Sequence, residues 1–103
     1  MNYNSLTSES VIALKRGVAI RFEHNYKNGV VILIDTINDS FLIANNESKI
    51  LIQLLNHNKS LQIKNIFAQI LTEYNEACHE KVLKILNDMI NLLYKKHFIE
   101  III

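Results

Sequence analysis

The stretch that decides the fold is Phe41–Leu55, FLIANNESKILIQLL. Its first four residues form a short apolar run that is typical of a strand. Further along, apolar residues recur with the period of a helix and form one stripe, made by Ile50, Leu51, Leu54 and Leu55. Asn45 or Asn46 is expected to cap this helix, because an Asn side-chain oxygen can accept a hydrogen bond from the first turn. The period therefore changes near Asn45 and divides the chain into a strand half and a helical half.

The half before Asn45 predicts three strands. In Val18–Glu23 apolar and more polar residues alternate, and Val30–Ile34 is a continuous apolar run typical of a central strand. Asn28-Gly29 predicts a reverse turn between these two strands, since both residues tolerate a positive φ. A second turn is expected at Ile37–Ser40, before the strand Phe41–Ala44. Strands joined by short turns favour an antiparallel meander.

The half after Asn45 predicts two further helices and a last strand. Ser60 is expected to cap the second helix, and the third is expected to run from about His79 to Lys96. Strand character returns at Phe98–Ile103. The predicted fold class is α+β, a winged helix-turn-helix with an N-terminal three-stranded antiparallel sheet followed by three helices and a closing strand. Residues 1–10 are expected to be a flexible N-terminus, and residues 11–103 a single domain.

Composition limits the kinds of partner. The chain has 103 residues, of which 50% are hydrophobic and 20% charged, which favours one packed core over a disordered chain. A net charge of +1 gives no electrostatic reason to expect nucleic acid or an anionic membrane as a partner. The single cysteine, Cys78, has no partner for an internal disulfide. Residues 1–10 are polar and do not resemble a signal peptide, so a cytoplasmic location is expected.

The sequence predicts a binding protein and not an enzyme, with no cofactor. None of the four histidines has the spacing from another histidine or cysteine that metal sites use, and Cys78-His79 are adjacent. The acidic residues Glu73, Glu76 and Glu80 span a predicted helix break, which favours a solvated surface over an acid–base pair. The two isolated glycines, Gly17 and Gly29, cannot form a phosphate-binding loop.

Three segments resemble the PqqD-like proteins, which are recognition elements for ribosomally made precursor peptides. Val18–Phe22 and Gly29–Ile34 resemble the opening hairpin of that family. Phe41–Leu55 resembles its short strand, junction and first helix, while the helix with Val82, Leu86, Met89 and Leu93, followed by His97–Glu100, resembles its last helix and closing strand. The chain departs from the family pattern where Ala44 replaces a usual Leu and His97 a usual Gly.

The resemblance implies binding of the leader segment of a precursor peptide and its delivery to a modifying enzyme. That enzyme would be a radical SAM enzyme, a cyclodehydratase or an adenylating enzyme. The leader would add as a strand to the edge Ser40–Ala44, beside a cleft shared with the last helix. The expected peptide-binding residues are Ser40, Phe41, Leu42, Ile43, Ala44, Leu83, Leu86, Ile90 and Tyr94.

The residue pattern supports such a site independently. An edge strand has unpaired N–H and C=O groups that an extended chain can satisfy. Phe41 and Ile43 are expected on one face of this strand and Leu42 and Ala44 on the other, so Leu42→Pro is expected to remove a donor from the edge. The apolar arc of the last helix spans about half of its circumference, which leaves one flank for a ligand. The alternative is that both flanks lie in the core or in a dimer contact, and loss of the fold in Ile90→Glu would indicate core.

Two other functions compete with peptide binding. A DNA-binding winged helix would use the lysines of the last helix, but Arg16 and Arg21 both lie in the strand half. A structural homodimer, or a subunit of a larger complex, is favoured by Ile101–Ile103, because three isoleucines at a chain end are costly to expose.

Overall fold

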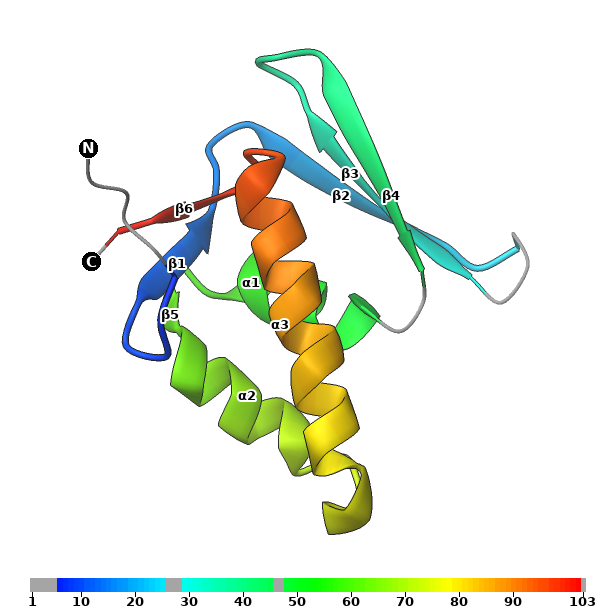
Figure 1. The fold of residues 1–103 in the computed structure, drawn as a ribbon. Coiled ribbons are helices and arrows are strands. Elements are labelled where there is room, and N and C mark those ends of the chain that lie inside the picture. The colour runs from blue at the N-terminus through cyan, green and yellow to red at the C-terminus, as the bar shows by residue number, and fades with distance from the viewer. Residues whose placement is uncertain (1–5, 26–28, 46–47, 103) are drawn as a thin grey trace.

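The computed structural model describes residues 6–25, 29–45 and 48–102. Within these ranges the fold is α+β, with two three-stranded antiparallel sheets and three α-helices (Figure 1). The elements, in chain order, are β1 (Val11–Leu14), β2 (Val18–Glu23), β3 (Val30–Asp35), β4 (Ser40–Asn45), α1 (Lys49–His57), β5 (Leu61–Gln62), α2 (Ile63–Leu71), the short 3-10 helix η2 (Glu76–Cys78), α3 (His79–Lys95) and β6 (Ile99–Ile101).

The predicted antiparallel meander is confirmed as the sheet β2-β3-β4. The prediction of one N-terminal sheet with a single closing strand is wrong, because β1 lies outside the meander and forms a second sheet in the order β5-β1-β6. In that sheet Ile12 lies opposite Leu61 on one side and Ile101 on the other. Three short strands from distant parts of the chain thus pair with one another, and local periodicity carries no information on that pairing.

One core joins the first sheet to the helices. The inner face of β2-β3-β4 contributes Val31, Leu33 and Ala44, and the helices contribute the larger share of the buried side chains. These helical residues are Leu51, Ile52, Leu55, Ile63, Ile66, Ile70, Leu86, Ile90 and Leu93. The sheet therefore packs through one face, and its upper part extends beyond the helices in Figure 1.

The first two helices, α1 and α2, begin later than the sequence predicts. Asn45 lies in β4, and Asn46 lies outside the described residues. α1 follows Ser48, whose buried hydroxyl donates a 2.8 Å hydrogen bond to the Asn45 carbonyl oxygen and so ties the helix to the end of β4. α2 follows Gln62 instead of Ser60, because Leu61–Gln62 pair with β1.

The N-terminal segment supplies the cap that α2 lacks from its own side chains. The N–H groups of Ile63 and Lys64 each donate a 2.9 Å hydrogen bond, to the carbonyl oxygens of Ser10 and Ser8 respectively. Lys64 also forms an ion pair with Glu9 at 3.3 Å. Residues 6–10, which the sequence analysis assigned to a flexible N-terminus, therefore lie against the start of α2 and satisfy donors that the first turn leaves open.

Asp35 fixes the turn between β3 and β4, which spans Thr36–Asp39. Its Oδ1 accepts hydrogen bonds of 3.0 Å from the N–H groups of Ile37 and Asn38, and its Oδ2 accepts one of 2.9 Å from Asn38 Nδ2. The Asn38 side chain and backbone hold the pKa of this carboxyl below its usual value, with a smaller contribution from Lys15. The turn is consequently stabilised at pH values above the usual pKa, and this stabilisation is lost as the pH falls through the lowered one.

α3 ends in a Schellman motif with a histidine at the left-handed position. Phe98 N–H donates to the Leu93 carbonyl at 2.9 Å, and His97 N–H donates to the Tyr94 carbonyl at 3.1 Å. His97 has a φ of 67°, a conformation that favours glycine. The buried side chains of Phe98 and Leu93 complete the motif, so packing holds His97 in this conformation.

His97→Gly is expected to increase the free energy of unfolding by about 0.5–1 kcal/mol, because relief of the left-handed strain exceeds the added chain entropy. Urea denaturation followed by circular dichroism measures the change. His97→Ala is the control and should give no increase, since alanine keeps the strain. Equal stability of the Gly and Ala variants would contradict the assignment of strain to this residue.

Candidate functional site

β4 is an edge strand. It pairs with β3 on one side, and no described residue pairs with its other side. Phe41 and Ile43 point to the outer face and are 66% and 56% exposed, while Leu42 is half-buried and Ala44 is buried. The predicted division of this strand between two faces is confirmed.

The hydrogen-bond register determines which backbone groups face the open edge. Thr36 N–H donates to the Gly17 carbonyl, which lies directly opposite in the β2–β3 register, at 3.0 Å. Since bonding alternates along an antiparallel pair, Leu33 turns its backbone groups to β4 and bonds with its partner Leu42. Phe41 and Ile43 therefore direct their N–H and C=O groups toward the open edge. The expectation that Leu42→Pro removes an edge donor is wrong, because the N–H of Leu42 faces β3.

An apolar trough lies beside the C-terminal end of β4. Its volume is about 290 Å³, and its lining residues come from the end of β4, the residue before α1, α1 itself and one flank of α3. They are Asn45, Ser48, Leu51, Ile85, Leu86, Asp88, Met89 and Leu92. A smaller cavity of about 120 Å³, between α1, α2 and α3, shares Leu51, Ile85 and Leu86 with the trough. Ile85 is 42% exposed at this shared boundary.

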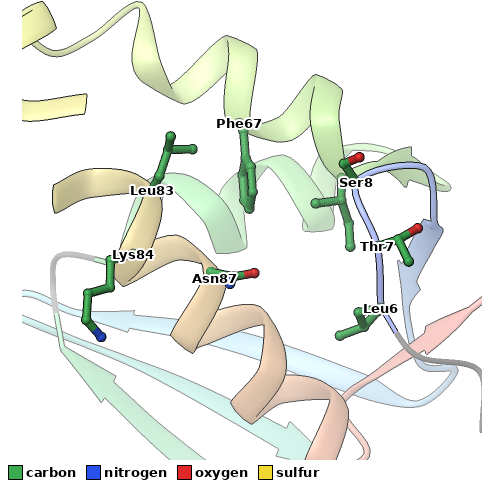
Figure 2. Close-up of a pocket in the computed structure, with 8 residues that line it drawn as sticks. Leu6, Thr7, Ser8, Phe67, Leu83, Lys84 and Asn87 are labelled. Carbon is green, nitrogen blue, oxygen red and sulfur yellow. The ribbon is translucent and has the colours of Figure 1, made fainter. Parts of the chain in front are cut away.

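The other flank of α3 does not face the edge strand. Ile90 is 1% exposed and Leu86 5%, so both are core residues, and Leu86 reaches the trough only at its floor. Tyr94 is half-buried against the core. Leu83 lines a separate cavity of about 510 Å³ between α2, α3 and Leu6–Ser8 (Figure 2). The structure thus does not bring β4 together with Leu83, Ile90 and Tyr94. The α3 side chains on the flank beside β4 are instead Ile85, Met89 and Leu92.

The trough residues could not be predicted, for an identifiable reason. Ile85, Met89 and Leu92 belong to the broad apolar arc of α3 that the periodicity revealed. Which flank of that arc faces β4 depends on how α3 rotates against α1 and α2. Burial of Ile90 and Leu93 in the core fixes this rotation and leaves the Ile85 flank toward the strand.

Ile90→Ala is expected to lower the free energy of unfolding by about 2–5 kcal/mol, because it creates a cavity in the core. Ile85→Ala is a matched control on the same helix and should cost less than about 1 kcal/mol, since its side chain is partly exposed. Urea denaturation gives both values. Similar losses in the two variants would show that the two flanks are not distinguished by packing.

Cys78 and His79 lie where α3 begins. Cys78 is an exposed free thiol, and His79 Nε2 lies 3.0 Å and 3.1 Å from the carbonyl oxygens of Leu71 and Tyr74, where it joins α2 to α3. Across residues 6–25, 29–45 and 48–102, no group of three or more His, Cys, Asp or Glu residues could hold a metal ion. None of the helices in these ranges is long and apolar enough to cross a membrane.

Comparison of the chain with family models, with curated proteins and with solved structures found no match. The geometry of β4 and the trough is therefore the basis for a functional proposal.

Ile43→Pro is expected to leave the domain folded, because the N–H that it removes faces the open edge. Leu42→Pro is the matched control and is expected to lower the free energy of unfolding by about 1–3 kcal/mol or more, since it leaves the Leu33 carbonyl unpaired. Thermal denaturation compares the two variants. A larger loss in Ile43→Pro than in Leu42→Pro would reverse the derived register.

Proposed function

We propose that this protein binds an extended peptide segment by strand addition to β4 and presents it to a modifying enzyme. The peptide class that fits the resemblance to the PqqD-like proteins is the leader segment of a ribosomally made precursor. The observation that carries the proposal is the open edge of β4 beside an apolar trough.

Backbone pairing supplies the first part of the interaction. Phe41 and Ile43 offer two N–H and two C=O groups at the edge, and an extended peptide can pair with all four. The side chains of these two residues lie exposed on the outer face, where they can contact alternate side chains of the peptide. Backbone pairing with β4 does not depend on the amino-acid sequence of the peptide, so selectivity has to come from the peptide's side chains.

The trough supplies the second part. A strand paired with β4 turns every other side chain to the inner side, and those near the Asn45 end lie toward Met89, Leu92 and Ile85. Full burial of one Leu, Ile or Phe stabilises a complex by roughly 1.5–3 kcal/mol. Two or three such contacts together with strand pairing, after the cost of association, correspond to a Kd of about micromolar.

A winged helix-turn-helix fold is part of the same proposal. Three helices followed by the returning strand β6 fit a winged helix-turn-helix whose role is protein binding instead of DNA binding. One observation supports this choice: the flank of α3 that carries Ile85, Met89 and Leu92 borders an apolar trough, and a DNA-reading helix would need polar side chains there.

Strand addition is tested with a displayed library of random 12-residue peptides panned on the immobilised protein. Enriched peptides should bind with a Kd of about micromolar by calorimetry, and the amides of Phe41 and Ile43 should become protected from hydrogen exchange. Ile43→Pro should weaken binding at least about tenfold, because it removes an edge donor. Ile43→Ala keeps the N–H and serves as the control, so its loss should be smaller.

Two results would contradict strand addition. One is unchanged affinity in a folded Ile43→Pro variant, and the other is protection confined to residues away from β4. Tight, salt-sensitive mobility shifts with duplex DNA, together with no enriched peptide, would favour the DNA-binding alternative. Delivery to an enzyme has a separate test, which is co-purification of the protein with a peptide-modifying enzyme.

A further inference from the structure

Another cavity lies at the other end of β4 from the trough, and its chemistry differs from that of the trough. Its volume is about 370 Å³, and it is lined by Lys15, Asp35, Asn38, Ser40, Lys96 and His97. We call it the basic cavity. Lys15 comes from the connection between β1 and β2, and Lys96 and His97 follow α3, so the fold brings three segments together at the first residue of β4.

The charge of the basic cavity is positive. Asp35 is the one acidic residue in its lining, and both of its carboxylate oxygens already accept hydrogen bonds from the turn residues Ile37 and Asn38. Lys15 lies close enough to contribute to the lowered pKa of Asp35. Neither Lys15 nor Lys96 forms an ion pair within the described part of the chain. Two ammonium groups against one carboxylate leave an excess of positive charge.

The trough has the opposite character. Its lining is mainly apolar, and its one charged residue is Asp88, which pairs with Lys84 at 3.2 Å. An acidic peptide residue would therefore be disfavoured at the trough and favoured at the basic cavity. The inner side of β4 is thus divided into an apolar end at Asn45 and a basic end at Ser40.

We propose, on the basis of the peptide-binding function above, that the bound peptide carries an apolar residue in the trough and an acidic residue four positions later at the basic cavity. Residues opposite each other in a pair share a face, so the peptide residues opposite Ala44 and Ser40 both point to the inner side. Along a strand these two are four residues, about 13 Å, apart. The apolar residue comes first because an antiparallel peptide, like every other paired strand here, runs from the Asn45 end to the Ser40 end.

The 12-residue library also tests this inference. Enriched peptides should share a Leu, Ile or Phe followed four residues later by Asp or Glu. A synthetic peptide of this sequence should bind the unmodified protein about fivefold more tightly than its Asp→Asn or Glu→Gln analogue. The difference should shrink at about 1 M NaCl, where surface charges are screened.

Variants identify the lysines responsible. Lys15→Gln with Lys96→Gln should remove the preference, so that the acidic peptide and its amide analogue bind within about twofold of each other. Lys59→Gln, an exposed lysine in the loop after α1, is the control and should keep the preference. The Lys96→Glu variant should bind a peptide with Lys at the acidic position more tightly than it binds the acidic peptide, which is the reverse of the preference of the unmodified protein.

The outcomes separate this inference from strand addition. Equal binding of the acidic peptide and its amide analogue, with binding still lost in Ile43→Pro, would overturn the proposed preference for an acidic peptide residue. It would leave strand addition intact. Enrichment of the acidic residue before the apolar one, or at another spacing, would overturn the proposed register. Normal binding in Ile43→Pro would overturn both.

Discussion

The packing of one sheet face against the helices is the constraint on which the rest of this structure depends. Val31, Leu33 and Ala44 lie in the same buried cluster as the α1 and α3 side chains, and the opposite face of the sheet has no such cover from the described residues. Because β3 is the central strand, β2 and β4 both become edges. The same packing buries Ile90 and Leu93 and so turns the Ile85 flank of α3 toward β4. An open backbone edge and an apolar trough are thus two results of one core.

The ends of β4 are defined by polar contacts. At one end, the Asp35 carboxylate accepts hydrogen bonds from the N–H groups of the turn. At the other end, the Ser48 hydroxyl donates a hydrogen bond to the Asn45 carbonyl just before α1. These contacts fix how many residues β4 presents and which of them turn inward. A peptide added to a strand of this length would have two inward positions far enough apart to meet different surroundings, so shape and charge would both contribute to selectivity under the proposed function.

The strand side of the site could be predicted from the sequence, but its helix side could not. The alternation of Phe41 and Ile43 with Leu42 and Ala44 follows from the period of a strand, and the third helix was located to within about a residue at each end. The cap of α2 could not be predicted, because the carbonyl groups of Ser8 and Ser10 that accept from its first turn are far away in the sequence. Similarly, the hydrogen bond between Thr36 and Gly17 reveals the register that turns the N–H and C=O groups of Leu42 toward β3. No pattern of side chains in the sequence predicts this register.

By itself, the sequence determined the type and order of most elements and the two faces of β4. These are properties of neighbouring residues, and the periods of a strand and a helix express them directly. Only the tertiary structure decided that β1 pairs with β5 and β6, that Ile85, Met89 and Leu92 line the trough at the end of β4, and that Lys15 and Lys96 line one cavity with Ser40. Each of these depends on contacts between segments far apart in the chain, which form only when the whole core packs.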